Sequence, residues 1–587
     1  MLWSAQACAA NLFPNPTFDD FDGDLPAGWT SEIWNQPMIK ERIHRLSPGR
    51  DGTGSCLEIE ETTPMTVMSL STPAFAVSPD REYLFKGYYA STCRGVATDK
   101  RWKDAEGISL SGTWLDAETK SIDTFTIVLP DTQDRWMEFF QEVRSPEAAQ
   151  ELKLVLSRRW VGGRLRFDDF TLREGTLRDF KEEFSIPHVP DEDFFPIYGW
   201  LIPGLSVTQE PDAHIDSDHH HALYALANFN LGNKAVFGLK RWLDRFEPID
   251  DAELAAVAED ETVWGFHWGD EPGEQVFPKI AEVHERFRRL VPTKPFWVNL
   301  LPTYGFESLE EYEHYIQAFI ETVKPTMFTY DHYCMVGNDP QRHADSWYSP
   351  NREGTYFANL EIVRRQALAA GSEFGVIVSV GTFGPVRGAS EAELRWQAFT
   401  TLAYGARSLG WFCYLTEVNS GHWTNWEDMV INRDGTRTRH YAMMKALNGE
   451  ILNWGPTLLR LTSTGVYHTE SLPDMTRPLT GSTLVESIRG GMGLVGEFRH
   501  QDGSSYVMIV NRDFIHPLPA QVKLRGSPKK LFEVSRQTGE TEPATGYSSN
   551  TAELNVQLAA GDARLYCLEE EHPREPEDER MKARKQE

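Results

Sequence analysis

Between residues 190 and 458 the chain alternates short apolar segments with amphipathic ones, and this alternation limits the possible folds more than any other feature. Such a pattern is typical of parallel strands joined by helices. The helix predicted over Glu274–Leu290, for example, has apolar residues at Val276, Ile280, Val283 and Phe287. The predicted strands are Phe195–Leu201, Lys234–Gly238, Thr262–Trp268, Phe296–Leu301, Met327–Tyr333, Phe374–Val380 and Leu409–Tyr414.

Residues 239–260 show no clear strand, but their length suits one further strand–helix unit. With that unit, the number of repeats and the length of the region fit a (β/α)8 TIM barrel over residues 190–458.

The regions on both sides of this barrel have a different pattern. Residues 11–175 consist of short alternating segments separated by Gly, Pro and Asp, which predicts an N-terminal β-sandwich. Residues 460–570 show the same pattern and predict a C-terminal β-sandwich, and the highly charged residues 571–587 predict a disordered tail. The chain of 587 residues is also too long for a single core, so we expect a multidomain protein.

The formal net charge of −29 excludes several classes of partner. Nucleic acids and anionic membrane surfaces both attract basic proteins, so we expect neither as a partner. No apolar stretch is long enough for a transmembrane helix. The short apolar start, Met1–Ala10, resembles the end of a secretory signal, so we expect a secreted or periplasmic protein. The sequence leaves the oligomeric state open.

The segment Val263–Pro272 is a strand that ends in two adjacent carboxylates. In (β/α)8 barrels the carboxyl ends of the strands form the active site. Because neighbouring side chains on a strand point in opposite directions, Asp270 and Glu271 must have different roles.

The ends of the other predicted strands carry further polar and aromatic residues. Carboxylates with aromatic side chains and no metal-ligand spacing suit cleavage of a glycosidic bond without a catalytic cofactor. We therefore predict Glu271 as the general acid, with Asp331 or Asp270 as the partner carboxylate. The predicted substrate-binding residues are Tyr198, Trp200, His267, Trp268, Asn299, Tyr304, Tyr330, His332, Tyr333, Trp411, Tyr414 and Glu417.

Two segments bracket the N-terminal region. Asn11–Asp19, followed by Pro26–Trp29, resembles the opening of carbohydrate-binding jelly rolls of the galactose-binding-like type, and Leu165–Leu172 resembles their closing strand. The resemblance implies a structural Ca²⁺ held by acidic residues near both ends, here Asp19 with Asp168 or Asp169. Whether this module binds sugar stays open.

The segment Trp264–Pro456 resembles the catalytic domain of retaining barrel glycoside hydrolases, clan A and its relatives, including β-galactosidase-like bacterial enzymes. The motifs are Trp264–Pro272, Val298–Pro302, Tyr330–Tyr333 and Leu394–Ala406. The resemblance implies a general acid at the end of strand four, which Glu271 matches. It also implies a nucleophilic Glu at the end of strand seven, where this chain has none, and an Asn at the position of Asp270.

Three alternatives remain. Adjacent Asp and Glu residues also resemble N-acetylhexosaminidases in which the substrate's acetamido group is the nucleophile; Asp270 would orient that group, and Tyr330 or Tyr333 would assist. The second alternative is a non-catalytic carbohydrate-binding protein on a degenerate barrel. The third is a polysaccharide lyase that uses Tyr333, His332 and Arg352.

Overall fold

The computed structural model describes residues 10–34, 42–61, 67–95, 107–202, 217–244, 250–336, 353–417, 425–433, 435–469 and 471–569. The predicted tail, 571–587, and nearly all of the signal-like start lie outside these ranges. The chain forms two compact units. One comprises Met1–Ser185, His214–Leu226 and Val430–Met443, and the other Ile186–Ala213, Ala227–Met429 and Met444–Glu587.

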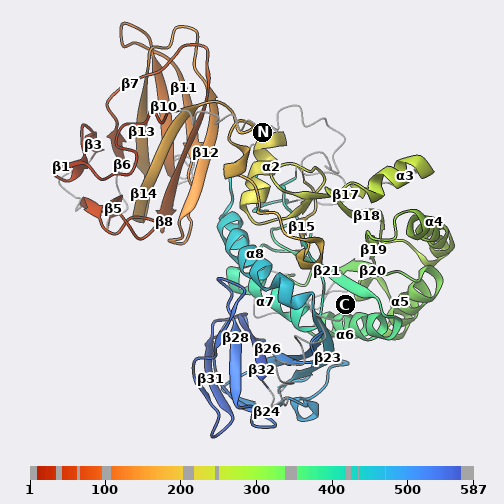
Figure 1. The fold of residues 1–587 in the computed structure, drawn as a ribbon. Coiled ribbons are helices and arrows are strands. Elements are labelled where there is room, and N and C mark those ends of the chain that lie inside the picture. Colours follow the sequence, from red (N-terminus) through yellow and green to blue (C-terminus); the bar gives the residue numbers. More distant parts are fainter. Residues whose placement is uncertain are drawn as a thin grey trace, which may run out of the picture. The chain divides into compact units, whose positions relative to one another are not determined.

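The N-terminal unit is built on two antiparallel sheets (Figure 1). Tyr83 contacts Trp114 across the sheets, with ring centroids 6.2 Å apart, and this packing confirms the β-sandwich. The first sheet runs β11 (Ser121–Val128), β10 (Gly107–Leu115), β13 (Glu151–Arg159), β6 (Val67–Ser71), β3 (Thr30–Trp34), with β7 (Phe75–Ala76) on β13. The second runs β12 (Met137–Arg144), β8 (Glu82–Ser91), β14 (Val161–Glu174), β5 (Cys56–Glu61), β4 (Arg42–Leu46), with β9 (Arg94–Gly95) on β14; β1 (Phe21–Asp22) and β2 (Leu25–Pro26) form a small hairpin.

This unit extends beyond the predicted range 11–175. Helix α2 (Ser217–Leu226) and residues 430–443 group with the sandwich. The His219 ring lies 4.9 Å from the ring of Phe140 on β12, and Arg437 donates a hydrogen bond to the carbonyl of Glu138.

The second unit contains the predicted barrel. Within the described residues, eight parallel strands run in the order β15–β22–β21–β20–β19–β18–β17–β16. Asn230, just before β16, hydrogen-bonds to Ile197 on β15 through its backbone N–H and its side chain, which brings the two end strands together. The (β/α)8 barrel is confirmed. Its strands are β15 (Ile197–Gly199), β16 (Leu231–Gly232), β17 (Lys240–Asp244), β18 (Val263–Asp270), β19 (Phe296–Leu300), β20 (Met327–Asp331), β21 (Glu373–Ser379) and β22 (Leu409–Phe412).

Two helices of the barrel begin at a serine that caps them. Ser308 accepts a hydrogen bond from the backbone of Glu311, and Ser390 forms a reciprocal capping box with Glu393. The helices are α3 (Asp251–Ala258), α4 (Phe277–Leu290), α5 (Leu309–Val323), α6 (Glu353–Ala370), α7 (Glu391–Ala403) and α8 (Arg439–Leu458). Short 3-10 turns η2 (Lys181–Glu183), η3 (Asp191–Asp193), η4 (Glu274–Val276) and η5 (Thr303–Gly305) connect elements.

The prediction of a strand over Lys234–Gly238 is wrong. Phe237 and Gly238 have φ angles of 51° and 75°, and Leu239 N–H bonds to Val236 in a turn, so the backbone cannot stay extended there. The second and third strands are β16 and β17 instead. Strand β17 was not predicted because it begins with charged residues, which are uncommon in buried strands, although Lys240 is buried here.

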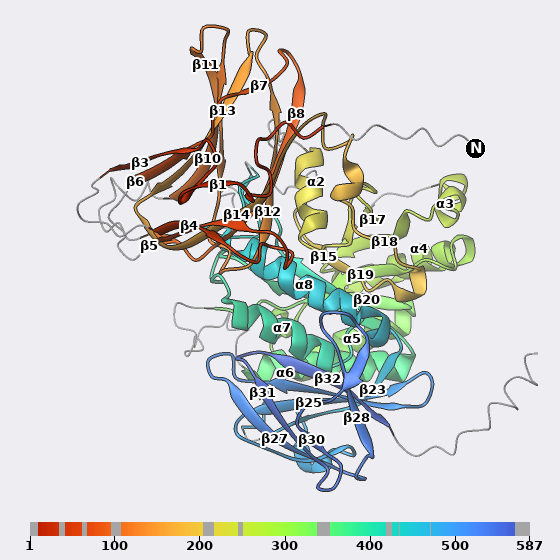
Figure 2. The ribbon, with the colours of Figure 1, turned by 60° about the vertical axis from the view of Figure 1, so that its left-hand side comes forward.

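The C-terminal residues form a second sandwich, as predicted. One sheet contains β23 (Leu461–His468), β25 (Gly493–His500), β26 (Ser505–Asn511), β32 (Ala563–Glu569), β28 (Lys530–Val534) and β29 (Thr541–Pro543). The other contains β24 (Val485–Arg489), β27 (Leu518–Leu524), β31 (Glu553–Leu558) and β30 (Tyr547–Ser548), and the 3-10 turn η6 (Leu479–Gly481) precedes β24. Helix α7 of the barrel packs on β25 and β26 (Figure 2).

No helix among the described residues is long and apolar enough to cross a membrane. The cysteines within the described ranges, including Cys56 and Cys93, are free thiols.

Candidate active site

Strand β18 contains a β-bulge immediately before the two carboxylates. His267 pairs with Trp297 and Asp270 pairs with Asn299, so two residues of β18 oppose one residue of β19. Glu271 follows with a φ angle of 47°, which is uncommon for a residue other than glycine. Bulges and such backbone strain both concentrate at active sites.

Strand β19 and helix α5 hold Glu271 in this conformation. Its backbone N–H donates to the carbonyl of Asn299 at 2.8 Å. The Tyr315 hydroxyl on α5 donates to the carbonyl of Pro272 at 2.8 Å. These contacts fix the turn after β18, and the side chains of Asp270 and Glu271 keep solvent-exposed surface.

Asn299 connects Asp270 with Asp331. Its Nδ2 donates to Oδ1 of Asp270 at 2.9 Å and to Oδ1 of Asp331 at 3.1 Å. The Thr329 hydroxyl donates to Oδ1 of Asn299 at 3.0 Å. Asn299, Thr329 and Asp331 are all buried. The predicted substrate contact of Asn299 stays a prediction; in the structure its amide donates to two carboxyl groups of the protein.

Asp331 donates the hydrogen bond between its side chain and that of Glu271. Burial raises the pKa of Asp331 well above its usual range, and the charges of Glu271 and Asp270 and this hydrogen bond raise it further. Protein atoms around the carboxyl group of Glu271 also raise its pKa, although part of the residue stays exposed, and the charge of Asp270 adds to this, whereas the hydrogen bond from Asp331 lowers it. Two carboxyl groups this close cannot both ionise readily, so the pair retains one proton above the ordinary carboxyl range.

Tyr333 lies close to the carboxyl groups. Burial raises the pKa of its hydroxyl, and the charges of Asp331, Asp270 and Glu271 contribute, so the hydroxyl stays neutral. Its ring contacts Phe383 and Phe412 at centroid distances of 5.2 and 5.0 Å. Sequence reasoning missed this aromatic cluster, which also includes Trp426. The sequence feature that could have revealed the cluster was the aromatic content of β22 and of the residues that follow it.

A second aromatic group joins Trp200, which follows β15, to His267 on β18 and Trp297 on β19. The ring of Trp200 meets that of His267 at 5.2 Å, and His267 lies 5.5 Å from Trp297. Trp268 occupies the bulge and is mostly buried, whereas Trp200 is half-buried. The structure thus brings three of the predicted residues together.

Tyr330 and Trp411 lie away from the carboxylates. Phe328, two residues before Tyr330 on β20, contacts Phe319 of α5, so this side of the strand faces the helices. Tyr330 is fully buried, and its charged form is disfavoured by Tyr312 and Tyr356 on α5 and α6. Trp411 donates to Asn448 of α8. These two residues stabilise the helix layer, and we do not propose them as substrate contacts.

The other predicted residues are largely buried. His332 hydrogen-bonds through Nδ1 to Asn359 of α6 at 3.0 Å and contacts the half-buried Tyr304. Tyr414 packs on Phe229. Glu417 is also buried. Arg352, which the lyase alternative requires, lies outside the described residues.

Tyr198 lies inside the barrel, below the carboxylates. Its ring packs on Trp242 and against the Cα of Gly410, where any side chain would clash with it. Burial raises the pKa of its hydroxyl, which lies near Thr329 and Ser408.

Residues 379–382, at the end of β21, carry no carboxylate, as the sequence predicts. Ser379 hydrogen-bonds to Gln397 of α7 through its backbone and its hydroxyl. The backbone of Glu427 pairs with Thr382 in an isolated bridge. Glu427 is exposed, and sequence reasoning did not find it because it lies beyond the last strand.

The acidic residues predicted to hold Ca²⁺ lie on both sides of residues 49–55. Asp19 accepts hydrogen bonds from the hydroxyls of Thr17 and Ser55, and Asp168 accepts from the backbone of Arg50 and Asp169. Protein donors thus already bind both carboxyl groups. No group of three or more His, Cys, Asp or Glu residues in the described ranges is arranged to hold a metal. The Ca²⁺ site stays a prediction.

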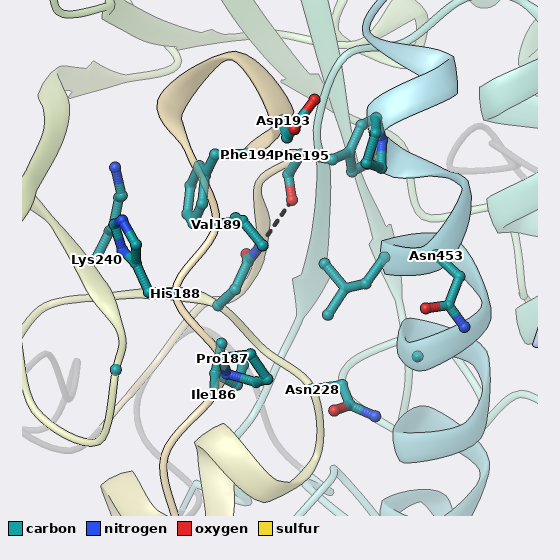
Figure 3. Close-up of a pocket in the computed structure, with 15 residues that line it drawn as sticks. Ile186, Pro187, His188, Val189, Asp193, Phe194, Phe195, Asn228, Lys240 and Asn453 are labelled. Atoms are coloured by element: carbon teal, nitrogen blue, oxygen red, sulfur yellow. Dashed lines mark hydrogen bonds between the residues drawn. The ribbon is translucent and has the colours of Figure 1, made fainter. Parts of the chain in front are cut away.

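A separate cavity of about 450 Å³ lies at the amino ends of β15, β16 and β17 (Figure 3). Residues 186–189 and 193–195 line it together with residues of α8, and Figure 3 shows Lys240 and Asn453 on opposite sides of the segment and helix that enclose it. None of the predicted site residues lines this cavity, which is at the end of the barrel opposite the carboxylates.

No protein-family model matches the chain, and no curated protein matches it. Among solved structures, a family 39 glycoside hydrolase from the gut symbiont Bacteroides cellulosilyticus is 12% identical, with a TM-score of 0.36 over 79% of this chain and 95% of its own. An arabinose-bound family 51 α-L-arabinofuranosidase is 12% identical (TM-score 0.28, 95% of this chain, 94% of its own).

The CBM22-1–GH10 modules of Clostridium thermocellum endo-1,4-β-D-xylanase 10B, complexed with xylohexaose, are 10% identical (TM-score 0.29, 74% of this chain, 96% of their own). These neighbours are glycoside hydrolases, the class that the sequence motifs resemble. At such low identities and TM-scores they do not bear on the activity of this chain, which we infer from its own residues.

Proposed function

We propose that this chain is a glycoside hydrolase in which Glu271 protonates the leaving glycosidic oxygen. The main support is the group of Asp270, Glu271 and Asp331 at the carboxyl ends of β18 and β20. Glu271 is exposed, has a strained backbone and is hydrogen-bonded to the buried Asp331. An acid with a raised pKa is what protonation of a leaving group near neutral pH requires.

Asp331 acts through Glu271 in this proposal. Retaining glycosidases hold their two carboxyl groups about 5–5.5 Å apart and inverting ones about 6.5–9.5 Å apart. Glu271 and Asp331 interact directly with each other, so we place Asp331 behind Glu271 and not across the substrate from it. The exposed Asp270 is therefore the better candidate for the second carboxylate that faces substrate.

A substrate-assisted N-acetylhexosaminidase is the second candidate function. Its support is the absence of a carboxylate at residues 379–382, all of which are described, together with the adjacency of Asp270 and Glu271. In this mechanism the substrate's acetamido oxygen attacks the anomeric carbon, Asp270 orients the acetamido group, and Glu271 protonates the leaving oxygen. Tyr333 is close enough to the carboxyl groups to contact the same sugar.

The remaining properties follow from this proposal. The partner is a poly- or oligosaccharide, bound by Trp200 and Phe412, the rings of the two aromatic groups that keep exposed surface. The chemistry needs no metal or other cofactor. Export to the periplasm or the medium would bring the enzyme to polymeric substrates.

The test is product release from a panel of glycans and aryl N-acetylhexosaminides by the wild type, Glu271→Gln and Glu274→Gln. We expect Glu271→Gln to lose about 10²-fold or more in rate, as loss of a general acid predicts. Glu274 is an exposed glutamate three residues away, so Glu274→Gln is the matched control and keeps wild-type activity.

The substrate cleaved decides between the two mechanisms. An enzyme that cleaves only 2-acetamido sugars uses the substrate-assisted mechanism. Equal activity of wild type and Glu271→Gln contradicts the role of Glu271. If the wild type binds a glycan of the panel without cleaving any, the carbohydrate-binding alternative is correct, and unsaturated, ultraviolet-absorbing products indicate the lyase.

A further inference from the structure

The side chain of Asn299 can have only one orientation in this structure. Its Nδ2 faces the carboxyl oxygens of Asp270 and Asp331, and its Oδ1 faces the hydroxyl of Thr329. The reversed amide would place its oxygen against both carboxyl groups, of which that of Asp270 is exposed and accepts hydrogen bonds when ionised. Asn299 and Thr329 are 2% and 1% exposed, so water does not replace these contacts.

We propose that Asn299 is a positioning residue for proton transfer: its donation to Asp331 favours the ionised form of Asp331 and so shifts the proton of the carboxyl pair from Asp331 toward Glu271. The Thr329 hydroxyl donates to Oδ1 of Asn299 and so polarises the amide that donates to Asp331. This inference rests on the proposed role of Glu271 as general acid.

The charges involved explain why such a donor is needed. In the transfer, the O–H bond of Glu271 breaks, its proton binds the glycosidic oxygen, and the electrons of the C–O bond stay on that oxygen. Both carboxyl groups of the pair are then ionised, and Asp331 carries its charge in a buried position. A buried carboxylate without hydrogen-bond donors is strongly disfavoured. The Asn299 N–H lowers this cost, while the developing positive charge on the sugar offsets the rest.

Other titratable groups also act on the pair. They are Asp270 on β18, Tyr198 on β15, Tyr312 and Tyr315 on α5, and Tyr333 after β20. The tyrosines have raised pKa values and stay neutral over the working range, so only Asp270 adds charge. Asn299 contacts both Asp270 and Asp331 and therefore controls how their charges are shared.

The experiment compares pH profiles of kcat/KM for the wild type, Asn299→Leu, Thr329→Val and Thr329→Ser. Leucine keeps the approximate shape of asparagine without its donors. We expect the basic limb of Asn299→Leu to move to higher pH by about one unit, because loss of the donor raises the pKa of the pair. We also expect a rate roughly 10- to 100-fold lower at the optimum.

Thr329→Val should give a smaller shift in the same direction, and Thr329→Ser, which keeps the hydroxyl, should restore the wild-type profile. Thr326→Val, at an exposed threonine before the same strand, is the control. If Asn299→Leu does not fold, the pH profiles of Thr329→Val and Thr329→Ser test the role of Asn299.

Infrared titration of the protonated carboxyl band provides a readout that does not need activity. The band is assigned by its loss in Glu271→Gln. The inference is supported if the pH midpoint of this band rises in Thr329→Val and returns to the wild-type value in Thr329→Ser. If this result is obtained but no glycoside is cleaved, only the proposed function fails. Unchanged midpoints in folded Asn299→Leu and Thr329→Val overturn it.

Discussion

At the scale of single residues, Glu271 is held in a conformation that it would not adopt alone. Its left-handed backbone costs about 1 kcal/mol or more. Its charge is close to those of Asp270 and Asp331. An arrangement that costs stability is expected where function requires it. The sequence identified Glu271 from its place after a strand, but backbone strain has no sequence signal in a residue other than glycine.

Glu271→Gln should therefore stabilise the protein at high pH. The raised pKa of the pair means that the folded state holds a proton that the unfolded chain loses, so stability falls as pH rises through the folded pKa. Gln removes one charge, and we expect Tm at pH 8 to rise by about 2–4 °C and the gain to shrink toward pH 5. Thermal melts at both values check this, with Glu274→Gln as control. A lower Tm at pH 8 contradicts the electrostatic explanation.

At the scale of elements, the bulge in β18 decides which carboxylate faces which neighbour. Without the extra residue, Asp270 would not pair with Asn299. The sequence predicted the strand, its end and its charges, because apolar runs bounded by Pro and charged residues are local signals. The register of β18 against β19 depends on residues 29 positions apart and could not be predicted from either strand alone. For the same reason the hydrogen bonds of Asn299 to two carboxyl groups were not predicted.

Asp168 on β14 makes the sandwich sensitive to pH. Burial raises its pKa to about 6, above the usual range of an aspartate. Because the folded state binds the proton more tightly, the sandwich should lose up to about 3 kcal/mol of unfolding free energy as pH rises from 4 to 7. Urea unfolding of the wild type and Asp168→Asn checks this: Asn should abolish the pH dependence, and the exposed Asp123→Asn should not.

The same variants test the predicted Ca²⁺. If Ca²⁺ binds beside Asp168, adding it at pH 7 stabilises the wild type and has no effect on Asp168→Asn. Unchanged wild-type stability excludes the site.

At the scale of the whole chain, buried ion pairs join the barrel to the C-terminal sandwich. Asp562, just before β32, contacts Arg395 of α7 at 2.9 Å and Arg536 at 2.5 Å, and both arginines also contact Glu450 of α8. Together with the packing of α7 on β25 and β26, this makes the sandwich an integral part of the catalytic unit. The sequence did not predict this network, because its residues are far apart along the chain.

Asp562→Asn should lower the free energy of unfolding of this unit by about 3–5 kcal/mol, since it leaves buried arginines without compensation. The exposed pair of Asp251 and Arg286 is the control, and Asp251→Asn should cost less than about 1 kcal/mol. Denaturant unfolding measures both. Equal losses in the two variants would show that the network contributes no more than a surface ion pair.

The central claim is that Glu271 donates the proton to the leaving group, and its most direct test is the dependence on that group. The measurement compares wild type and Glu271→Gln on two glycosides of the cleaved sugar, one with a sugar leaving group and one with an acidic phenol, which leaves without protonation. We predict a loss of about 10²-fold or more with the sugar and almost none with the phenol. Equal losses on both substrates would contradict the role of Glu271 as general acid.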